Sequence, residues 1–332
     1  MTTLQMPTPF SVASATPAER LAVAELIAEC FAFTYPDDPP LIPTLLAAEL
    51  THVTPGERID QFVIWEGERA LAYGKLDYSL TQNRHTGQAQ VLVRPDRRRR
   101  GLGQRMFTAL SDQARQARHR LMTFVTTDRA PAGEPFATKQ GAKVALLDRR
   151  SQLDLKLLDD ALLERWLERP ADDPFQLHVW RTVPGAYLTQ MAGLIMVMNT
   201  APRGDLDVDD WQITPEMIRA WEGMIAESGD VRHTLVIEDS RTGELVGYSE
   251  SDWHPLRAAV IGQGATAVRP EARGQGLGKW LKAAMLRVVV AECPGARVVR
   301  TSNAEENAAM LSINVALGFT PWSSVSEWQL RL

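Results

Sequence analysis

The stretch VRPDRRRRGLG, at Val93–Gly103, returns later in the chain as VRPEARGQGLG, at Val268–Gly278. The two stretches stand 175 residues apart (276 minus 101). Each one combines a proline, basic side chains and closely spaced glycines. Recurrence of such a stretch indicates a structural unit that occurs twice in one chain.

The repeat extends beyond these two stretches. At the same distance, Tyr73 recurs as Tyr248 and Gly87 recurs as Gly262. Further on, the QLDL that begins at Gln152 recurs as QLRL 177 residues later (329 minus 152), which places a small length change between the copies. A chain of 332 residues is also too long for one ordinary core and fits two domains.

The segment between the copies is charged and is expected to be helical. It runs from Leu157 to Asp173 and ends in RPADDP, whose prolines and acidic residues are typical of a boundary. We therefore expect an N-terminal domain at residues 1–156, a linker at 157–173 and a C-terminal domain at 174–332.

Hydrophobic periodicity predicts the same order of elements in both copies: a strand, a helix, a hairpin, a strand that enters the glycine turn, an amphipathic helix and a further strand. In the first copy these are expected at Phe10–Ala15, Pro17–Phe33, Gln61–Trp65, Ala70–Tyr78, Gln88–Val93, Leu102–Ala117 and Leu121–Thr126. In the second copy they are expected at Phe175–Thr182, Pro184–Asn199, Thr234–Ile237, Leu245–Trp253, Gly264–Val268, Leu277–Ala291 and Arg297–Thr301.

Composition excludes several classes of protein. A hydrophobic fraction of 45% and a charged fraction of 23% are those of a globular protein, and no apolar run is long enough to span a bilayer. A net charge of −5 disfavours a general nucleic-acid binder. Met1–Phe10 lacks a secretion signal, so we expect a cytoplasmic protein. Cys30 and Cys293 are interpreted as buried thiols rather than as nucleophiles, and no spacing of residues indicates a metal site.

The second glycine turn is suited to a pyrophosphate. A strand that leads through this turn into a helix directs several unpaired backbone N–H groups at one point, where the helix dipole also favours an anion. Gly274, Gly276 and Gly278 allow a close approach, and Arg273 and Lys279 add positive charge. The alternative is a glycine-rich helix start with solvated arginines. Neither turn matches the phosphate loops of ATP-binding or NAD-binding folds.

At this point the sequence resembles the GNAT superfamily of N-acetyltransferases, whose central motif is Arg/Gln-x-x-Gly-x-Gly/Ala. Both copies match it, with Arg98, Gly101 and Gly103 in the first and Arg273, Gly276 and Gly278 in the second. The second copy also carries a later signature of the superfamily, consisting of Asn303, Asn307, Met310, Asn314 and Leu317–Phe319.

The resemblance implies an α/β fold of the α+β type, with two tandem domains that each hold a mixed, mostly antiparallel sheet flanked by helices. It also implies acetyl-CoA as co-substrate, with its pantetheine arm between diverging fourth and fifth strands, near Val268. For Asn307 the alternative is a helix cap. The residues that it assigns to the cofactor are Thr266, Val268, Arg273, Gly274, Gln275, Gly276, Leu277, Gly278, Lys279, Asn303 and Asn307, and, in the first copy, Val93, Arg98, Arg99, Arg100, Gly101, Leu102 and Gly103.

Acetyl transfer to an amine requires a base, because an alkylamine with a pKa of about 10 is protonated at neutral pH. The candidate is Glu250, although its strand face is equally consistent with a solvated face. Many members of the superfamily protonate the leaving thiolate with a tyrosine at the position of Asn314, which here is an amide and cannot act as an acid. Tyr248 is the other candidate for that step. In the first copy, Lys75 stands where Glu250 lies.

These residues predict an N-acetyltransferase that moves an acetyl group from acetyl-CoA to a small-molecule amine, with its active site in the C-terminal half. The first copy is expected to bind a CoA-like anion without catalysing, and Asp128 stands in it where Asn303 lies. The competing hypothesis is a non-catalytic protein that binds or senses acyl-CoA. We expect no nucleic-acid, membrane or metal partner, and either a monomer that is a pseudo-dimer or a homodimer.

Overall fold

The computed structural model describes residues 5–332 and divides the chain into two compact units. Unit 1 holds the chain up to Leu147 together with Asp205–Asp209 and Val325–Leu332. Unit 2 holds Asp148–Gly204 and Asp210–Ser324. The expectation about a secretion signal falls partly on residues 1–4, which lie outside the described residues.

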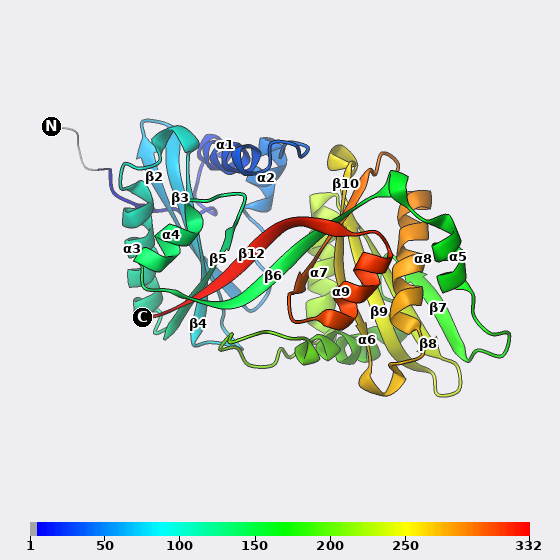
Figure 1. The fold of residues 1–332 in the computed structure, drawn as a ribbon. Coiled ribbons are helices and arrows are strands. Elements are labelled where there is room, and N and C mark those ends of the chain that lie inside the picture. The colour runs from blue at the N-terminus through cyan, green and yellow to red at the C-terminus, as the bar shows by residue number, and fades with distance from the viewer. Residues whose placement is uncertain (1–4) are drawn as a thin grey trace. The chain divides into compact units, whose positions relative to one another are not determined.

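Unit 1 contains a sheet with helices on both faces (Figure 1). Its strands are β1 (Thr8–Pro9), β2 (Glu57–Glu66), β3 (Arg69–Ser79), β4 (Thr86–Val93) and β5 (Leu121–Thr127), with the end of β12 (Thr320–Arg331). Its helices are α1 (Pro17–Thr34), α2 (Pro43–Glu49), α3 (Leu102–Gln116) and α4 (Gly133–Lys139).

Unit 2 repeats this plan. Its strands are the second part of β6 (Lys143–Asp154), then β7 (Phe175–Trp180), β8 (Val231–Asp239), β9 (Glu244–Trp253), β10 (Val260–Val268) and β11 (Val298–Ala304). Its helices are α5 (Asp160–Leu167), α6 (Leu188–Ile195), α7 (Pro215–Ser228), α8 (Leu277–Glu292) and α9 (Ala308–Ala316).

Both sheets are mixed and mostly antiparallel. The order of strands is β1-β2-β3-β4-β5-β12 in unit 1 and β6-β11-β10-β9-β8-β7 in unit 2. In each unit one pair is parallel, β4 with β5 and β10 with β11. The pairs β1–β2, β2–β3, β3–β4, β5–β12, β6–β11, β7–β8, β8–β9 and β9–β10 are antiparallel. The expected fold class is therefore confirmed.

The two units exchange their last strands. The end of β12 pairs with β5 from Val325 opposite Thr127 to Arg331 opposite Leu121. The second part of β6 pairs in the same manner with β11, where Asp154 lies opposite Val298. Each copy of the repeat thus completes the sheet of the other unit, so the compact units differ from the contiguous ranges expected from the sequence.

The two faces of the unit 2 sheet are covered by different helices. α8 packs on one face against Leu235 and Ile261, and α6 packs on the other face against Val236 and Tyr248. Because side chains alternate along a strand, neighbouring residues of β9 contribute to opposite faces. This alternation places Glu250 on the α6 face, with Tyr248.

Most expected elements are present, with two differences. Phe10–Ala15 was expected as a strand and forms a turn instead. The side chains of Phe10 and Val12 pack into the apolar cluster under α1, and the segment does not pair with a neighbouring strand along its length. The expected linker is part of unit 2. Its helix α5 buries Leu163 against the α8 core, and Arg287 of α8 forms ion pairs with Asp160 and Glu164.

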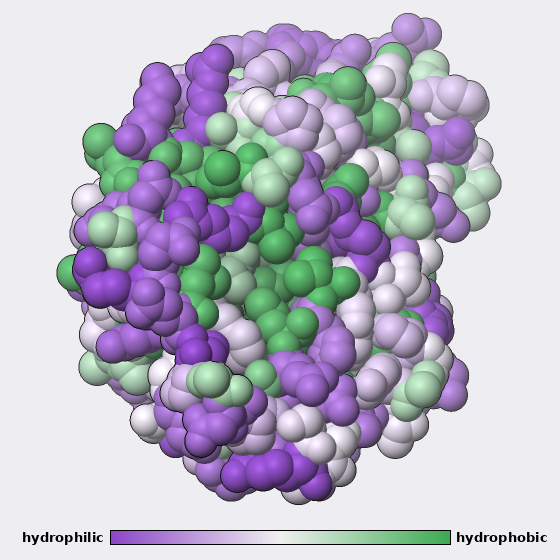
Figure 2. Space-filling view, turned by 90° about the vertical axis from the view of Figure 1, so that its right-hand side faces the viewer, coloured by the Kyte–Doolittle hydropathy of each residue, from purple (hydrophilic) through white to green (hydrophobic). Residues whose placement is uncertain are grey.

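Figure 2 shows the side of the molecule on the right of Figure 1, where hydrophobic residues gather in the centre among hydrophilic ones. The strand at this edge of the unit 2 sheet is β7, and its Val179 is exposed. Between residues 5 and 332 no helix is long and apolar enough to cross a membrane.

Candidate active site

The second glycine turn leads from β10 into α8 without a side-chain cap. Gly274 and Gly276 adopt φ angles of +80° and +77°, in the left-handed region that favours glycine. Gly276 is the N-cap residue of α8, and no side chain accepts a hydrogen bond from the first turn of the helix. A Cβ atom added at Gly274 would meet no other atom within 4 Å. The turn therefore presents free amide groups to open space, as a bound phosphate requires.

Gly278 lies beside the helix that follows β11. A Cβ atom added there would lie 3.5 Å from Cδ1 of Ile313 on α9. The matching Gly103 has the same relation to Phe136 on α4, at 3.9 Å. An added Cβ atom would thus make an ordinary van der Waals contact with the next helix in each unit.

The basic side chains of the second turn are held by the protein itself. Arg273 donates from Nε to the carbonyl oxygen of Val268 at 3.0 Å and from a terminal nitrogen to Oγ1 of Thr200 at 3.0 Å. Nζ of Lys279 lies 5.4 Å from the ring centroid of Trp166. These contacts leave the backbone amides as the groups of this turn that point at an anion.

Arg169 is a part of the loop that sequence reasoning missed, since it lies in the expected linker. Its guanidinium donates to the carbonyl oxygen of Gln275 at 2.9 Å, and it forms an ion pair with Asp173. It also lies over the ring of Trp280, 5.2 Å from the centroid. No sequence signal marks this residue, because the contact joins segments more than a hundred positions apart.

The strands on either side of the turn diverge, as the resemblance implies. β10 pairs with β11 only from Val260 opposite Val298 to Gly262 opposite Arg300. Beyond this point β10 has a register shift between Gln263 and Thr266. The edge of β10 from the bulge to Val268 therefore lacks a neighbouring strand on the β11 side, which leaves backbone groups for an extended ligand to pair with.

Thr266 and Tyr248 are tied into the protein near this bulge. The Thr266 hydroxyl shares a hydrogen bond with the Ser249 hydroxyl, the two oxygens being 2.7 Å apart. Tyr248 is buried in the apolar cluster under α6, and burial raises the pKa of its phenol. A phenol with a raised pKa is a weak proton donor, so its surroundings favour a packing role.

Glu250 lies beside the bulge at the point where the strands separate. Its Oε2 would be 3.9 Å from a Cβ atom added at Gly264, and 19% of its side chain is exposed. Burial raises the pKa of Glu250, and the neighbouring Arg232 opposes this. Arg232 lies 3.8 Å from Oε1 of Glu250 but donates two hydrogen bonds to Asp252, at 2.7 and 3.1 Å. A partly buried carboxylate with a raised pKa is suited to accept a proton.

The three asparagines of the later signature have different roles. Asn307 is the N-cap of α9, where its side chain accepts a hydrogen bond from the amide of Met310 at 3.2 Å. Asn314 is fully buried and donates from Nδ2 to Oδ1 of Asn303 at 2.7 Å. Oδ1 of Asn314 is buried and has no hydrogen-bond partner among the described residues. The cap reading of Asn307 is the one that the structure supports.

We expect Asn307→Ala to lower the free energy of unfolding by about 1 kcal/mol, the usual cost of losing a side-chain cap. Asn307→Ser retains a capping oxygen and is expected to keep the wild-type value, as measured by urea unfolding. A role at the cofactor is indicated instead if Asn307→Ser unfolds normally yet binds CoA ten times more weakly.

In the first turn, Arg99 takes the place of Gly274 and has a φ of +62°. Arg98 donates to the carbonyl oxygen of Val93 at 3.2 Å, as Arg273 does to Val268, and it lies over the ring of Phe33. Arg99 and Arg100 are exposed, next to the uncapped start of α3. This turn also presents free amides, with more positive charge around them.

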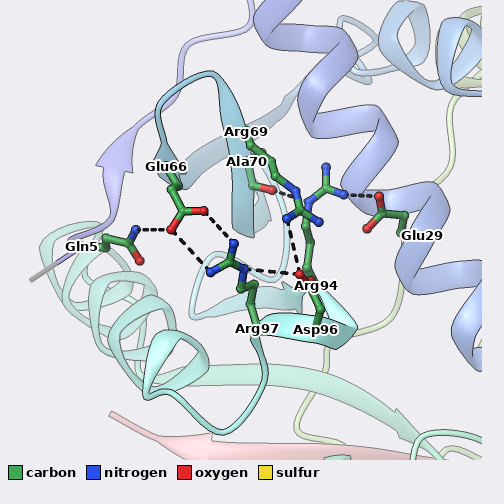
Figure 3. Close-up of polar contacts among 8 residues, drawn as sticks. All are labelled: Gln5, Glu29, Glu66, Arg69, Ala70, Arg94, Asp96 and Arg97. Atoms are coloured by element: carbon green, nitrogen blue, oxygen red, sulfur yellow. Dashed lines mark hydrogen bonds and ion pairs between the residues drawn. The ribbon is translucent and has the colours of Figure 1, made fainter. Parts of the chain in front are cut away.

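Other arginines of the first turn hold it in place (Figure 3). Arg94 is buried, donates to the carbonyl oxygen of Ala70 at 2.6 Å and forms an ion pair with Glu29. Arg97 forms an ion pair with Glu66 at 2.7 Å. Arg269 of unit 2, which corresponds to Arg94, donates to the carbonyl oxygen of Leu245 at 2.7 Å.

Neither thiol takes part in this site. Cys30 and Cys293 are free and buried, and burial raises the pKa of Cys293 to about 11 and also raises that of Cys30. A thiol with a raised pKa is a poor nucleophile at neutral pH, so the interpretation of these residues as structural is supported. No group of His, Cys, Asp or Glu between residues 5 and 332 is arranged to hold a metal ion.

Comparisons with known proteins agree with this geometry. The family model described as "Acetyltransferase (GNAT) family" matches residues 20–142 and again residues 198–319. A tandem GNAT protein from the clavulanic acid biosynthesis pathway, solved without acetyl-CoA, is 25% identical over 99% of this chain and 98% of its own, with a TM-score of 0.80. A comparison with curated protein sequences finds no match.

Two further solved structures share the fold. A GCN5-related N-acetyltransferase from Sphaerobacter thermophilus is 16% identical, over 98% of this chain and 95% of its own, with a TM-score of 0.66. An acetyltransferase from Pyrococcus horikoshii, described as putative, is 13% identical over 99% of this chain and 90% of its own, with a TM-score of 0.59.

Proposed function

The chain belongs to the GNAT family of acetyltransferases, and we propose that it transfers an acetyl group from acetyl-CoA to the amine of a small molecule, at a site in its C-terminal half. The observation that carries this proposal is the position of Glu250, beside the bulge of β10 where that strand leaves β11. The uncapped turn at the start of α8 follows the same strand.

The residues of this half fit acetyl-CoA. The amides from Arg273 to Gly278 would hold the pyrophosphate, and the free edge of β10 up to Val268 would pair with the pantetheine arm. Acetyl-CoA supplies the activated acetyl group. A backbone N–H of β10 near Thr266 would stabilise the negative charge that develops on the carbonyl oxygen.

Glu250 would remove the proton that the acceptor amine has to lose. An ordinary carboxylate has a pKa near 4 and is a weak base for an amine with a pKa of about 10. Burial raises the pKa of Glu250, which narrows this gap. The overall charge of −5 adds a reason to propose a cationic small molecule rather than a polyanion as acceptor.

The N-terminal half lacks such a base. Lys75 occupies the matching position and forms an ion pair with Asp77 at 2.7 Å. The first turn retains its free amides and its exposed arginines, Arg99 and Arg100. We therefore propose that this half binds a CoA-like anion without catalysing transfer.

The proposal is tested by measuring thiol release from acetyl-CoA with a panel of small primary amines and with no amine. We expect release that depends on the amine, together with an acetylated product detected by mass spectrometry. The rival function, non-catalytic binding of acyl-CoA, predicts saturable CoA binding by calorimetry but no amine-dependent release. That second result would overturn the enzymatic proposal.

Replacement of Glu250, the proposed base, should lower the rate of acetyl transfer. We expect Glu250→Gln to lower kcat by a factor of about 10² to 10⁴, the usual contribution of a general base. Because Glu250 acts only when ionised, the ratio of wild-type to variant kcat should rise with pH and level off above the pKa of Glu250. That pKa is raised by burial, so the rise is expected above the usual range of a carboxyl group.

The matched control is Glu244→Gln, a change of the same kind at an exposed position of the same strand. It should leave kcat and its pH profile as in the wild type. A Glu250→Gln enzyme with an unchanged pH profile and rate would assign the base to another group and leave Glu250 on a solvated face.

A further inference from the structure

Lys282 is a charged side chain in the core of unit 2 that the proposed reaction does not yet use. It lies on α8 with only 1% of its surface exposed. Nζ lies 5.8 Å from the ring centroid of Phe319, the residue that precedes β12. Among residues 5–332 no carboxylate forms an ion pair with it, and burial alone lowers the pKa of Lys282 to about 7.

Lys282 faces the region between α8, β11 and α9. It follows Gly278 by one helical turn and therefore lies on the same face of α8, the face that meets Ile313. Phe319, its neighbour, donates its amide to the carbonyl oxygen of Asn314 at 3.0 Å. Through Phe319 the lysine is thus connected to Asn314 of α9, whose Nδ2 donates to Oδ1 of Asn303 of β11.

Two amide oxygens in this layer lack partners. Oδ1 of Asn314 and Oε1 of Gln263 are buried and accept no hydrogen bond from any described residue. Gln263 lies in the bulge of β10, opposite Ser251, and donates to the hydroxyl of Ser249 at 3.2 Å. A buried polar group without a hydrogen-bond partner costs free energy. Two such oxygens near the point where β10 and β11 separate therefore indicate that a ligand binds there.

Unit 1 provides the comparison, once the copies are aligned by their strand pairing. Asn303 lies opposite Arg149, and Thr126 lies opposite Ser326, 177 residues after Arg149 (326 minus 149). Asn303 therefore corresponds to Thr126, and the alignment with Asp128 expected from the sequence is wrong. The reason is the two-residue length change that lies between the glycine turn and this strand.

In unit 1 the same space is filled by aromatic rings. Phe107 corresponds to Lys282 (282 minus 175), and its ring lies 5.5 Å from those of Phe124 and Phe136, edge to face with both. With the offset of 177, these rings correspond to Thr301 and Ile313 of unit 2. The fold thus allows an apolar filling at this place, and unit 2 has a lysine instead, although its burial lowers stability.

From this arrangement we propose that Lys282 donates the proton that the departing CoA thiol needs, and that the aromatic filling of unit 1 excludes the reaction there. This inference rests on the proposed function. Lys282 lies on the α8 face of the unit 2 sheet and Glu250 lies on the α6 face. The base and the acid would therefore act from opposite sides of the gap between β10 and β11.

The proposed step balances in atoms and charge. A bond forms between the acceptor nitrogen and the acetyl carbon, and the bond from that carbon to sulfur breaks. The acceptor reacts as the neutral amine, after its ammonium form has lost one proton to solvent. The proton that the nitrogen loses as the amide forms goes to the Glu250 carboxylate, and the sulfur takes a proton from the Lys282 ammonium. Exchange with solvent then returns both groups to their starting states. A thiol has a pKa of about 8.5, so an acid near neutrality can protonate it.

The test compares Lys282→Met with Lys156→Met, which removes an exposed lysine of the same unit that lies outside the proposed site. We expect Lys282→Met to lower kcat 10-fold to 100-fold while the Kd for CoA, measured by calorimetry, stays within twofold. The ratio of wild-type to variant kcat should be greatest below pH 7 and fall above it, because only the ammonium can donate. Lys156→Met should leave kcat unchanged.

A second readout does not depend on turnover. The folded protein holds the Lys282 proton less tightly than the unfolded chain, whose lysine pKa is about 10.4. Wild type should therefore gain stability relative to Lys282→Met as pH rises from about 7 to 10, in urea unfolding. Below pH 7 both states are protonated, and the variant should be the more stable protein.

The outcomes separate the two proposals. Wild-type protein without turnover on any amine overturns both. If the wild type turns over and Lys282→Met has the same kcat, only the role of Lys282 is overturned. The expected gain in wild-type stability with rising pH would then identify Lys282 as a buried neutral amine. A loss of kcat that is the same at every pH also contradicts proton donation, since a packing defect would have that effect.

Discussion

Gly276→Asp is expected to weaken CoA binding by a factor of about 100 and to reduce turnover to background. The new carboxylate would stand at the N-cap of α8, where the free amides of the turn would otherwise meet the pyrophosphate. Two like charges about 4 Å apart near a protein surface repel by roughly 4 kcal/mol. Arg169 lies 3.5 Å from the added Cβ atom, but it is already paired with Asp173.

The matched control for this substitution is Gly276→Asn. Asn and Asp have nearly the same shape, and both tolerate the φ of +77° better than other side chains do. Gly276→Asn should therefore carry the same backbone strain without the charge and should keep most of the affinity for CoA. Equal losses in the two variants would mean that strain in the turn, and not repulsion of an anion, causes the effect.

The same pair of changes at Gly101 tests whether the two halves differ. We expect Gly101→Asp to leave kcat within about twofold of the wild type and to remove any second, weaker CoA site seen by calorimetry. Its carboxylate would stand near Arg105, whose terminal nitrogen is 3.9 Å from the added Cβ atom. Equal loss of turnover from Gly101→Asp and Gly276→Asp would overturn the division of labour between the halves.

Removal of Val325–Leu332 is expected to unfold unit 1 while unit 2 keeps its structure. These residues are the last in the chain, yet they form the strand beside β5. Trp328 is 4% exposed in the core of unit 1 and donates from Nε1 to Oγ1 of Thr126 at 2.9 Å. Trp328→Ala alone should cost about 3 to 5 kcal/mol, as for other buried aromatic residues.

Limited proteolysis followed by mass spectrometry measures this effect. Cleavage sites in the truncated protein should gather before Leu147, and unit 2 should resist the protease longer. Trp322→Ala is the control, because Trp322 is on the same strand, belongs to unit 2 and is only half buried. A truncated protein whose first 147 residues stay resistant would show that β12 is not needed for the stability of unit 1.

The conformational preferences of neighbouring residues were enough to predict the backbone of the candidate site, that is, the two glycine turns and the helix starts that follow them. The glycine spacing predicted both turns, and the helices begin at Leu102 and Leu277 as expected. These features depend on residues close together in the sequence: glycine reaches positive φ without strain, and a helix leaves its first amides free. The mixed, mostly antiparallel sheet and the divergence of β10 from β11 came with the family resemblance.

Side-chain partners could not be read in the same way. Arg97 and Arg273 carry charges that suit a phosphate, but Arg97 pairs with Glu66 and Arg273 donates to Thr200, and both partners lie far away in the sequence. A pattern of residues shows which charges are present. Which of them are neutralised depends on distant segments that fold against them.

The sequence by itself determined that this protein is a doubled GNAT chain with a glycine turn before a helix in each half, because repeats, glycines and helix starts are local. The tertiary structure decided which strands complete each sheet, which arginines remain exposed and where Lys282 lies. Those outcomes depend on contacts between residues far apart in the chain, since burial and charge pairing exist only after folding. For this reason the exchange of β6 and β12 and the buried lysine left no mark in the residue pattern.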